Sequence, residues 1–251
     1  MNQGAISHWI EGAIVHLKFS HPAGNSCTSR MLKELASEVS RWSKEENIKV
    51  IVVRSDEHTA FCAGANLSEV VALATREESK EFFMGFARLI LAIKESPKLV
   101  IARVHAKAVG GGVGLIAACD MAFATSTSML RLSEINLGIA PLVIAPALIR
   151  KIGVAAFSSL SLNPTTWLDH HWAYDNGLFT HKYDSLEALD KDLKDRLAQI
   201  SNWSDQAIKA LKSTFWEGTE SWDQLLEAKA EATAQLAVTD YTQEQLKKYK
   251  K

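Results

Sequence analysis

Two glycine-rich segments, each directly after an apolar run, constrain the fold of this chain more than any other feature. The first, residues 61–67, reads Phe-Cys-Ala-Gly-Ala-Asn-Leu and follows the apolar run at residues 50–53. The second, residues 109–115, reads Val-Gly-Gly-Gly-Val-Gly-Leu, follows the run at 99–104 and opens a helical pattern. Glycine destabilises regular structure, so such clusters indicate tight turns or close backbone approach. Both segments therefore mark a point where a buried strand meets the start of a helix.

The start of a helix carries backbone N–H groups that have no partner within the helix, together with the positive end of the helix dipole. Such N–H groups bind an anion or a developing oxyanion well, and two donors from two loops form an oxyanion hole. Each segment taken alone is better explained as a packing device between a helix and a strand. Their occurrence at equivalent points of two strand–helix units favours the oxyanion hole.

The apolar pattern around these segments predicts a parallel α/β core. Residues 50–53 are continuously apolar, which is typical of a strand buried on both faces. An amphipathic stretch over residues 77–94 separates this run from the next one at 99–104. From about Ile144 onward we expect no further strands, because only the helical period persists. The apolar faces of this helical part predict contact with a neighbouring subunit.

Composition narrows the function further. The 251 residues fit one domain, or one domain with a small appendage, and a net charge of −1 gives no electrostatic case for binding nucleic acid or an anionic membrane. The three cysteines are too scattered for a disulfide framework or a metal site. The beginning of the chain does not read as a signal peptide, and no apolar run approaches the roughly 20 residues that a membrane span needs. We therefore expect a cytoplasmic protein with no metal and no membrane or nucleic-acid partner.

A dinucleotide site is the competing interpretation of the second glycine segment. Residues 112–117 fit the pattern G-x-G-x-x-A, and Glu134 lies about twenty residues further on, where a ribose-binding acid is expected. This interpretation leaves residues 61–67 without a role and begins late in the chain. Binding of a nicotinamide cofactor, or its absence, separates the two interpretations.

The two segments resemble a paired signature of a known family. Residues 61–67, together with residues 108–120, are similar to the enoyl-CoA hydratase/isomerase, or crotonase, family. The similarity continues through residues 132–141 and recurs at 151–153 and 172–178, in the family's order. The pattern around residues 110–115 resembles members that hydrate methylglutaconyl-CoA in leucine degradation.

The resemblance implies an α/β fold: a crotonase-like β-β-α spiral core over residues 1–190 and a helical C-terminal trimerisation region over residues 191–251. It also implies a homotrimer or a dimer of trimers. The substrate would be an acyl-CoA thioester, and no cofactor is implied, because coenzyme A is part of the substrate.

The resemblance also carries site residues over to this chain. The backbone N–H groups of Ala65 and Gly111 match the oxyanion donors. Glu134 matches the second of two glutamates that hydratases commonly carry, whereas Gly114 stands where the first would be. We therefore expect Glu134 to be catalytic and Gly114 to leave room for water or a branched acyl group. The residues expected to line the substrate are Ala63, Gly64, Asn66, Leu67, Gly110, Gly114 and Pro141.

The missing acid at Gly114 leaves the reaction open. One carboxylate suffices for hydration, because it can take a proton from water and return one to the α-carbon. Hydration of a short or branched 2-enoyl-CoA, by a hydro-lyase, is the leading hypothesis. A crotonase-fold isomerase, decarboxylase or thioesterase, or a non-catalytic acyl-CoA-binding member, remains the alternative.

Overall fold

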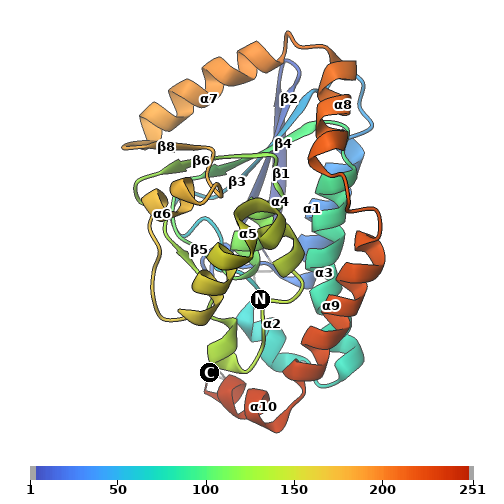
Figure 1. Cartoon of the computed structure of the whole chain (residues 1–251), viewed down its shortest axis with the longest axis vertical. Helices are drawn as coiled ribbons and strands as arrows, with labels where there is room; N and C mark the ends of the chain where they lie inside the picture. The colour runs from blue at the N-terminus through green and yellow to red at the C-terminus, as the bar shows by residue number, and fades with distance from the viewer. Residues whose placement is uncertain (1–3, 249–251) are drawn as a thin grey trace.

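The apolar runs pair into one six-stranded sheet, of order β1-β2-β3-β4-β6-β8, in the computed structural model, which describes residues 4–248 (Figure 1). β1 and β2 form an antiparallel hairpin, and every other neighbouring pair is parallel. The strands are β1 (Ala5–Glu11), β2 (Ile14–Ser20), β3 (Val50–Ser55), β4 (Leu99–Val104), β6 (Met121–Thr125) and β8 (His181–Tyr183).

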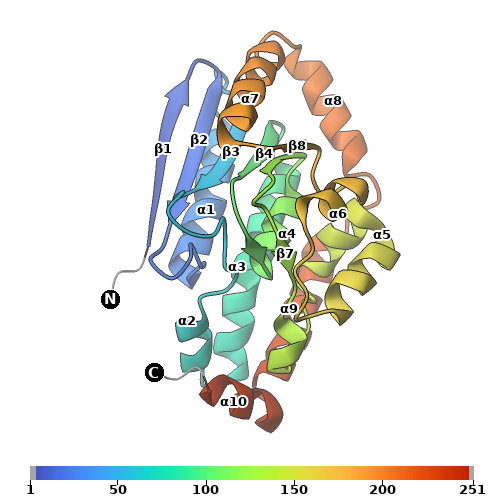
Figure 2. The ribbon, with the colours of Figure 1, turned by 90° about the vertical axis from the view of Figure 1, so that its left-hand side faces the viewer.

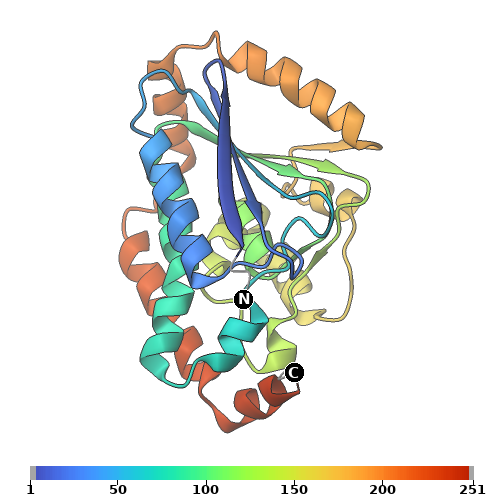
Figure 3. The ribbon, with the colours of Figure 1, turned by 180° about the vertical axis from the view of Figure 1, so that it is seen from behind.

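Helices cover both faces of this sheet, which is why its central strands are continuously apolar. Side chains of β3 alternate between the faces: Ile51 and Val53 pack with α1 (Ser29–Trp42) and α3 (Arg76–Glu95), which run side by side (Figure 3). Val50 and Val52 pack on the opposite side with α7 (Leu186–Ile200). Burial on both faces confirms the parallel α/β core that the apolar runs predicted.

A second, smaller ladder links the loops that follow the main strands. β5 (Ala108–Val109) pairs in parallel with β7 (Leu130–Arg131). Single parallel bridges join Cys62 to Ala108 and Cys27 to Ala65. This ladder brings both glycine segments together at one end of the sheet.

The remaining helices close the molecule around that end. α9 runs along α3, and α10 lies against α2 and η1 at the lower end of the molecule (Figure 2). The last part of the chain therefore packs back onto the first. These elements are α2 (Leu67–Ala72), α4 (Gly111–Ala118), the 3-10 helix η1 (Glu134–Leu137), α5 (Ala145–Leu162), α6 (His170–Asp175), α8 (Asp205–Phe215), α9 (Trp222–Ala237) and α10 (Asp240–Lys247).

The structure corrects the sequence-based outline in one respect. β8 follows Ile144 and extends the sheet beside β6, so the expectation of no strand after that residue is wrong. Its three residues are too short to show a period of two. The domain boundary expected between residues 190 and 191 falls inside α7.

Helix α5 is the one helix among residues 4–248 that is long and apolar enough to cross a membrane. Ala147 and Leu148, two of its buried residues, belong to the main hydrophobic core. It is also broken at Gly153, where φ is +74° and ψ is 164°. α5 also packs against α4.

Candidate active site

The first glycine segment forms the loop between β3 and α2, and glycine is required at its centre. Gly64 has a φ of +85°, and a Cβ atom added there would lie 2.8 Å from the Val109 carbonyl oxygen. The Gly64 carbonyl accepts a hydrogen bond of 2.7 Å from the Cys27 N–H. Because the Gly64 carbonyl and the Ala65 N–H belong to one planar peptide, this hydrogen bond also fixes the direction of the Ala65 N–H.

The second glycine segment forms the loop between β5 and α4. Gly110 has a φ of +52°, and a Cβ atom added there would lie 2.6 Å from Oε1 of Glu134. Gly111 is the first residue of α4, and a Cβ atom there would lie 2.2 Å from the ring of Phe86. Glycine at these positions lets the loop approach both the carboxyl group and the ring closely.

The two loops are fastened to each other, and each leaves a free N–H donor. Val109 N–H donates to the Cys62 carbonyl at 2.8 Å, which connects the segments directly. Within residues 4–248, neither the Ala65 N–H nor the Gly111 N–H donates to a protein acceptor. Both residues line one cavity. Two unpaired donors from two rigid loops are the requirement for an oxyanion hole.

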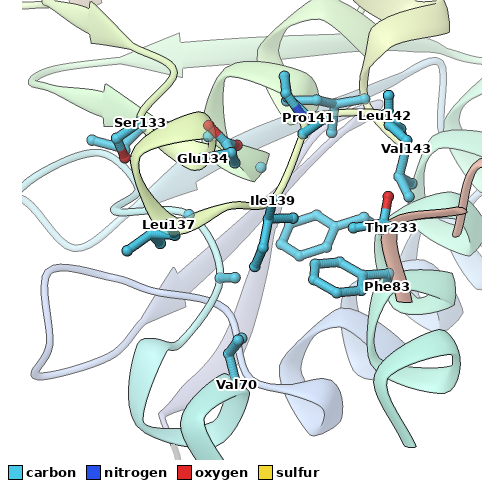
Figure 4. Close-up of a pocket in the computed structure, with 18 of the residues that line it drawn as sticks. Val70, Phe83, Ser133, Glu134, Leu137, Ile139, Pro141, Leu142, Val143 and Thr233 are labelled. Carbon is cyan, nitrogen blue, oxygen red and sulfur yellow. The ribbon is translucent and has the colours of Figure 1, made fainter. Parts of the chain in front are cut away.

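That cavity has a volume of about 160 Å³ and is largely apolar. Figure 4 shows Ser133, Glu134 and Pro141 on the wall formed by η1 and the loop after it, with Phe83 and Thr233 on the facing helices. The lining residues are Ala63, Gly64, Ala65, Leu67, Val70, Phe83, Phe86, Val109, Gly110, Gly111, Ser133, Glu134, Leu137, Ile139, Ala140, Pro141, Leu142, Val143, Ile144 and Thr233.

Glu134 is the only titratable side chain among these lining residues. Its Oε2 atom is buried and has no hydrogen-bond partner in the described part of the chain. Burial raises the pKa of Glu134 to about 7, although the backbone N–H groups of Glu134 and Ser133 partly favour the charged form. A carboxyl group with this pKa exchanges protons readily near neutral pH, as a general acid–base requires.

Gly114 does not provide the open space that the sequence predicted. A Cβ atom there would lie 2.2 Å from Cγ2 of Ile144, so the Ile144 side chain occupies the volume beside it. Gly114 is buried, whereas Ile144 lines the cavity. The expectation of room for water or a branched acyl group at Gly114 is therefore corrected. The apolar Ile144 side chain occupies the space into which the first of the two family glutamates would project from position 114.

Most of the other predicted residues meet in this cavity. Ala63, Gly64, Leu67, Gly110 and Pro141 line it, together with Ala65, Gly111 and Glu134.

Asn66 is different and does not line the cavity. Its side-chain oxygen accepts from the Glu69 N–H at 3.1 Å and caps α2, and its Nδ2 donates to Ser26 Oγ at 2.9 Å. Asn66 thus orients the loop from behind, through the α2 cap.

Sequence reasoning missed the cavity residues that come from distant helices. Phe83 and Phe86 belong to α3, and Thr233 belongs to α9. Their helical spacing is that of ordinary core positions, and nothing local marks them as cavity walls. Ile144 was also missed, because the glycine at position 114 does not indicate which distant residue fills the space beside it.

The positions of Gly112 and Glu134 do not fit a dinucleotide-binding site. A Cβ atom at Gly112 would lie 2.6 Å from Cβ of Cys62, so this glycine serves the contact between the two loops. Glu134 follows β7, but its Oε1 lies 2.6 Å from the position of a Cβ atom at Gly110, which is too close for a ribose to lie between this acid and the glycine loop.

Two unpaired N–H donors and one buried carboxyl group around an apolar cavity define a site for an acyl group whose carbonyl oxygen gains negative charge. The sequence model of the family described as enoyl-CoA hydratase/isomerase matches residues 9–250. The chain therefore belongs to the enoyl-CoA hydratase/isomerase family.

Similar proteins agree with this family and fold. A Bacillus subtilis protein named "Probable enoyl-CoA hydratase" is 33% identical over 137 residues, 55% of this chain and 53% of that protein, so the match spans about half of that relative. An enoyl-CoA hydratase of Alternaria alternata is 27% identical over 224 residues, 85% of this chain and 71% of that protein. The structure of an enoyl-CoA hydratase from Bacillus halodurans shares the fold, with a TM-score of 0.90 over 97% of this chain and 99% of that one, at 22% identity.

The named activities of other relatives differ. A human mitochondrial methylglutaconyl-CoA hydratase is 32% identical over 117 residues, which is 47% of this chain and 34% of that protein. An ethylmalonyl-CoA decarboxylase of Xenopus tropicalis is 28% identical over 133 residues, 53% of this chain and 44% of that protein. Family membership alone therefore leaves the reaction and the acyl group open.

Proposed function

We propose that this chain is a hydro-lyase that adds water to a 2-enoyl-CoA thioester, with Glu134 as its single acid–base group. The observation that carries the proposal is the unpartnered Oε2 of Glu134 in a cavity that also exposes the N–H groups of Ala65 and Gly111. The thioester carbonyl oxygen would accept from both N–H groups, and the double bond would then lie toward Glu134. No cofactor is required beyond the coenzyme A of the substrate.

The proposed reaction balances with one carboxylate. Glu134 removes a proton from water while the water oxygen bonds to C3, and the C2–C3 double bond becomes an enolate. The two N–H groups stabilise the enolate oxygen, in a cavity whose apolar walls strengthen these hydrogen bonds. The protonated Glu134 then delivers its proton to C2, which regenerates the carboxylate.

A double-bond shift is the second candidate, and Ile144 is the observation that favours it. With Ile144 beside Gly114, no second acid holds the attacking water. One carboxyl group is enough to move a proton between C4 and C2 of a 3-enoyl-CoA thioester, and that reaction needs no water.

One set of incubations separates the two candidates. We expect short 2-enoyl-CoA thioesters to lose the absorbance of the conjugated thioester as the 3-hydroxyacyl product forms. Conversion of 3-enoyl-CoA to 2-enoyl-CoA without hydration would replace the hydratase proposal by the isomerase. If saturated acyl-CoA thioesters bind but exchange no α-proton in D₂O and neither enoyl substrate reacts, the chain only binds acyl-CoA and both candidates fail.

We propose a homotrimer or a dimer of trimers, supported by exposed apolar side chains on the C-terminal helices such as Leu211 and Phe215. We also propose a cytoplasmic location, supported by three buried free cysteines, Cys27, Cys62 and Cys119, which suit a reducing compartment.

A further inference from the structure

The cavity around Glu134 contains no positive charge. Among residues 4–248, no lysine, arginine or histidine lines it, and Glu134 is an acid. The side chains that face one another in Figure 4 are mainly apolar, including Val70, Phe83 and Ile139. Beyond the two N–H groups proposed to hold the thioester oxygen, an acyl group that enters this space meets mainly hydrocarbon and one carboxyl group.

The polar groups that remain are poor partners for an anion. The Thr233 hydroxyl is already committed, because it donates to the Lys229 carbonyl at 2.8 Å. Ser133 offers one neutral hydroxyl. Arg131, the basic residue nearest to Glu134 in sequence, lies outside the lining, and its guanidinium group stacks 4.3 Å from the Trp167 ring centroid.

We propose, on the basis of the proposed acyl-CoA site, that the acyl group of the substrate is uncharged and apolar, and that the cavity excludes acyl groups carrying a second carboxylate. Burying an ion without a partner is strongly unfavourable, and the nearby Glu134 carboxylate would add repulsion. Methylglutaconyl and ethylmalonyl groups each carry a free carboxylate. A preference for uncharged acyl groups would therefore distinguish this chain from the relatives that are named for those two substrates.

Equilibrium binding of two matched thioesters tests this inference without requiring any reaction. Valeryl-CoA and glutaryl-CoA have linear five-carbon acyl chains and no double bond, and they differ at the terminal group, methyl against carboxylate. At pH 8 we expect calorimetry to give glutaryl-CoA a Kd at least about 100-fold larger than that of valeryl-CoA. Free coenzyme A serves as the reference for the contribution of the nucleotide part.

A variant that adds a cation provides the complementary test. Leu142 lines the cavity and is half-buried, so a lysine there can place its ammonium group at the edge of the cavity. We expect Leu142→Lys to reduce the ratio of the two Kd values about 10-fold or more, while the apolar control Leu142→Met leaves the ratio near that of the wild type. Circular dichroism confirms that each variant is folded, and the wild-type comparison stands if one is not.

The outcomes are distinct. Glutaryl-CoA binding as tightly as valeryl-CoA to the wild type would overturn the inference and leave the proposed function intact. A folded Leu142→Lys variant with an unchanged ratio would also overturn it, because the lining would then not select for charge. If neither thioester binds more tightly than coenzyme A, the acyl site itself is wrong and the inference falls with it.

Discussion

Glu134 is subject to opposite demands from folding and from catalysis. Its carboxyl group is buried without a partner for Oε2, and this burial raises its pKa from an ordinary 4.5 to about 7. A base must be ionised, yet ionisation is what the apolar cavity opposes. Stability and activity should therefore change in opposite directions with pH.

The substitution Glu134→Gln tests the acid–base role of this carboxyl group in turnover. The amide keeps the size of the side chain but cannot accept the proton, so we expect kcat to fall about 10²–10⁴-fold with little change in acyl-CoA affinity. In the wild type, kcat/KM should rise with pH and reach half its maximum near pH 7.

Glu69→Gln is the control for this experiment. The Glu69 carboxylate accepts from the Ser29 N–H at 2.9 Å at the start of α1, so its loss should cost about 1 kcal/mol of stability and leave kcat unchanged. Wild-type turnover by Glu134→Gln on the best substrate would refute the acid–base role.

The ionisation of Glu134 should lower the stability of the folded protein as the pH rises. The folded-state pKa of Glu134 lies above its unfolded value, so its contribution to stability is complete below pH 4.5 and is lost as the pH rises through about 7. The loss amounts to about 3 kcal/mol in the free energy of unfolding. Relative to the wild type, Glu134→Gln should therefore gain stability between pH 5 and pH 8 in urea denaturation. A difference between the two proteins that does not change with pH would contradict the burial of this carboxyl group.

At the scale of elements, the contact between α4 and the start of α5 determines how many acids the cavity holds. Gly114 is buried in α4, and Ile144 precedes α5 and fills the volume next to it. A side chain at position 114 and the Ile144 side chain cannot occupy this space together. A second carboxylate could enter the cavity from α4 only if Ile144 were also replaced.

This mutual exclusion predicts that the effect of Gly114→Ala on stability changes sign when Ile144 is removed. Gly114→Ala alone would place a Cβ atom 2.2 Å from Ile144 Cγ2 and 2.5 Å from its Cβ, and should destabilise the protein by about 1–3 kcal/mol. In an Ile144→Gly background both contacts are gone, and the same substitution should be neutral or stabilising by about 0.5–1 kcal/mol, because alanine favours a helix over glycine. Chemical denaturation of the four proteins measures the coupling, and additive effects would contradict the steric exclusion.

The sequence predicted the elements that carry strong local signals and missed those that depend on distant packing. The apolar runs of β3 and β4 and the two glycine segments were recognisable, because burial on both faces and positive φ values restrict which residues are allowed. Phe83 and Thr233 meet at the cavity through the packing of α9 on α3, which no local pattern specifies. Gly114 was recognised as unusual, but its neighbour Ile144 is thirty positions away in the sequence.

At the scale of the whole molecule, helix α8 carries apolar side chains both on the side buried in this chain and on the exposed side. Ile208 and Trp216 of the α8 region are buried in the core of the same chain, whereas the apolar faces of the C-terminal helices had predicted contact with a neighbouring subunit. Leu211 and Phe215 lie one helical turn apart on the exposed side, with 52% and 42% of their surface accessible. An exposed apolar pair on a helix that already packs on its other side supports a contact with a second copy of the chain.

We expect sedimentation velocity at micromolar concentration to show a species of about 83 kDa, three times the 27.7 kDa of one chain, or twice that mass. Leu211→Glu combined with Phe215→Glu should shift the protein toward the monomer, because each charge would have to be desolvated within a subunit contact. Lys191→Glu, which changes a charge on the exposed side of α7, is the matched control and should leave the sedimentation coefficient unchanged. A wild-type protein that sediments only as a 27.7 kDa monomer would refute the trimer, and a double variant that remains trimeric would place the subunit contact away from α8.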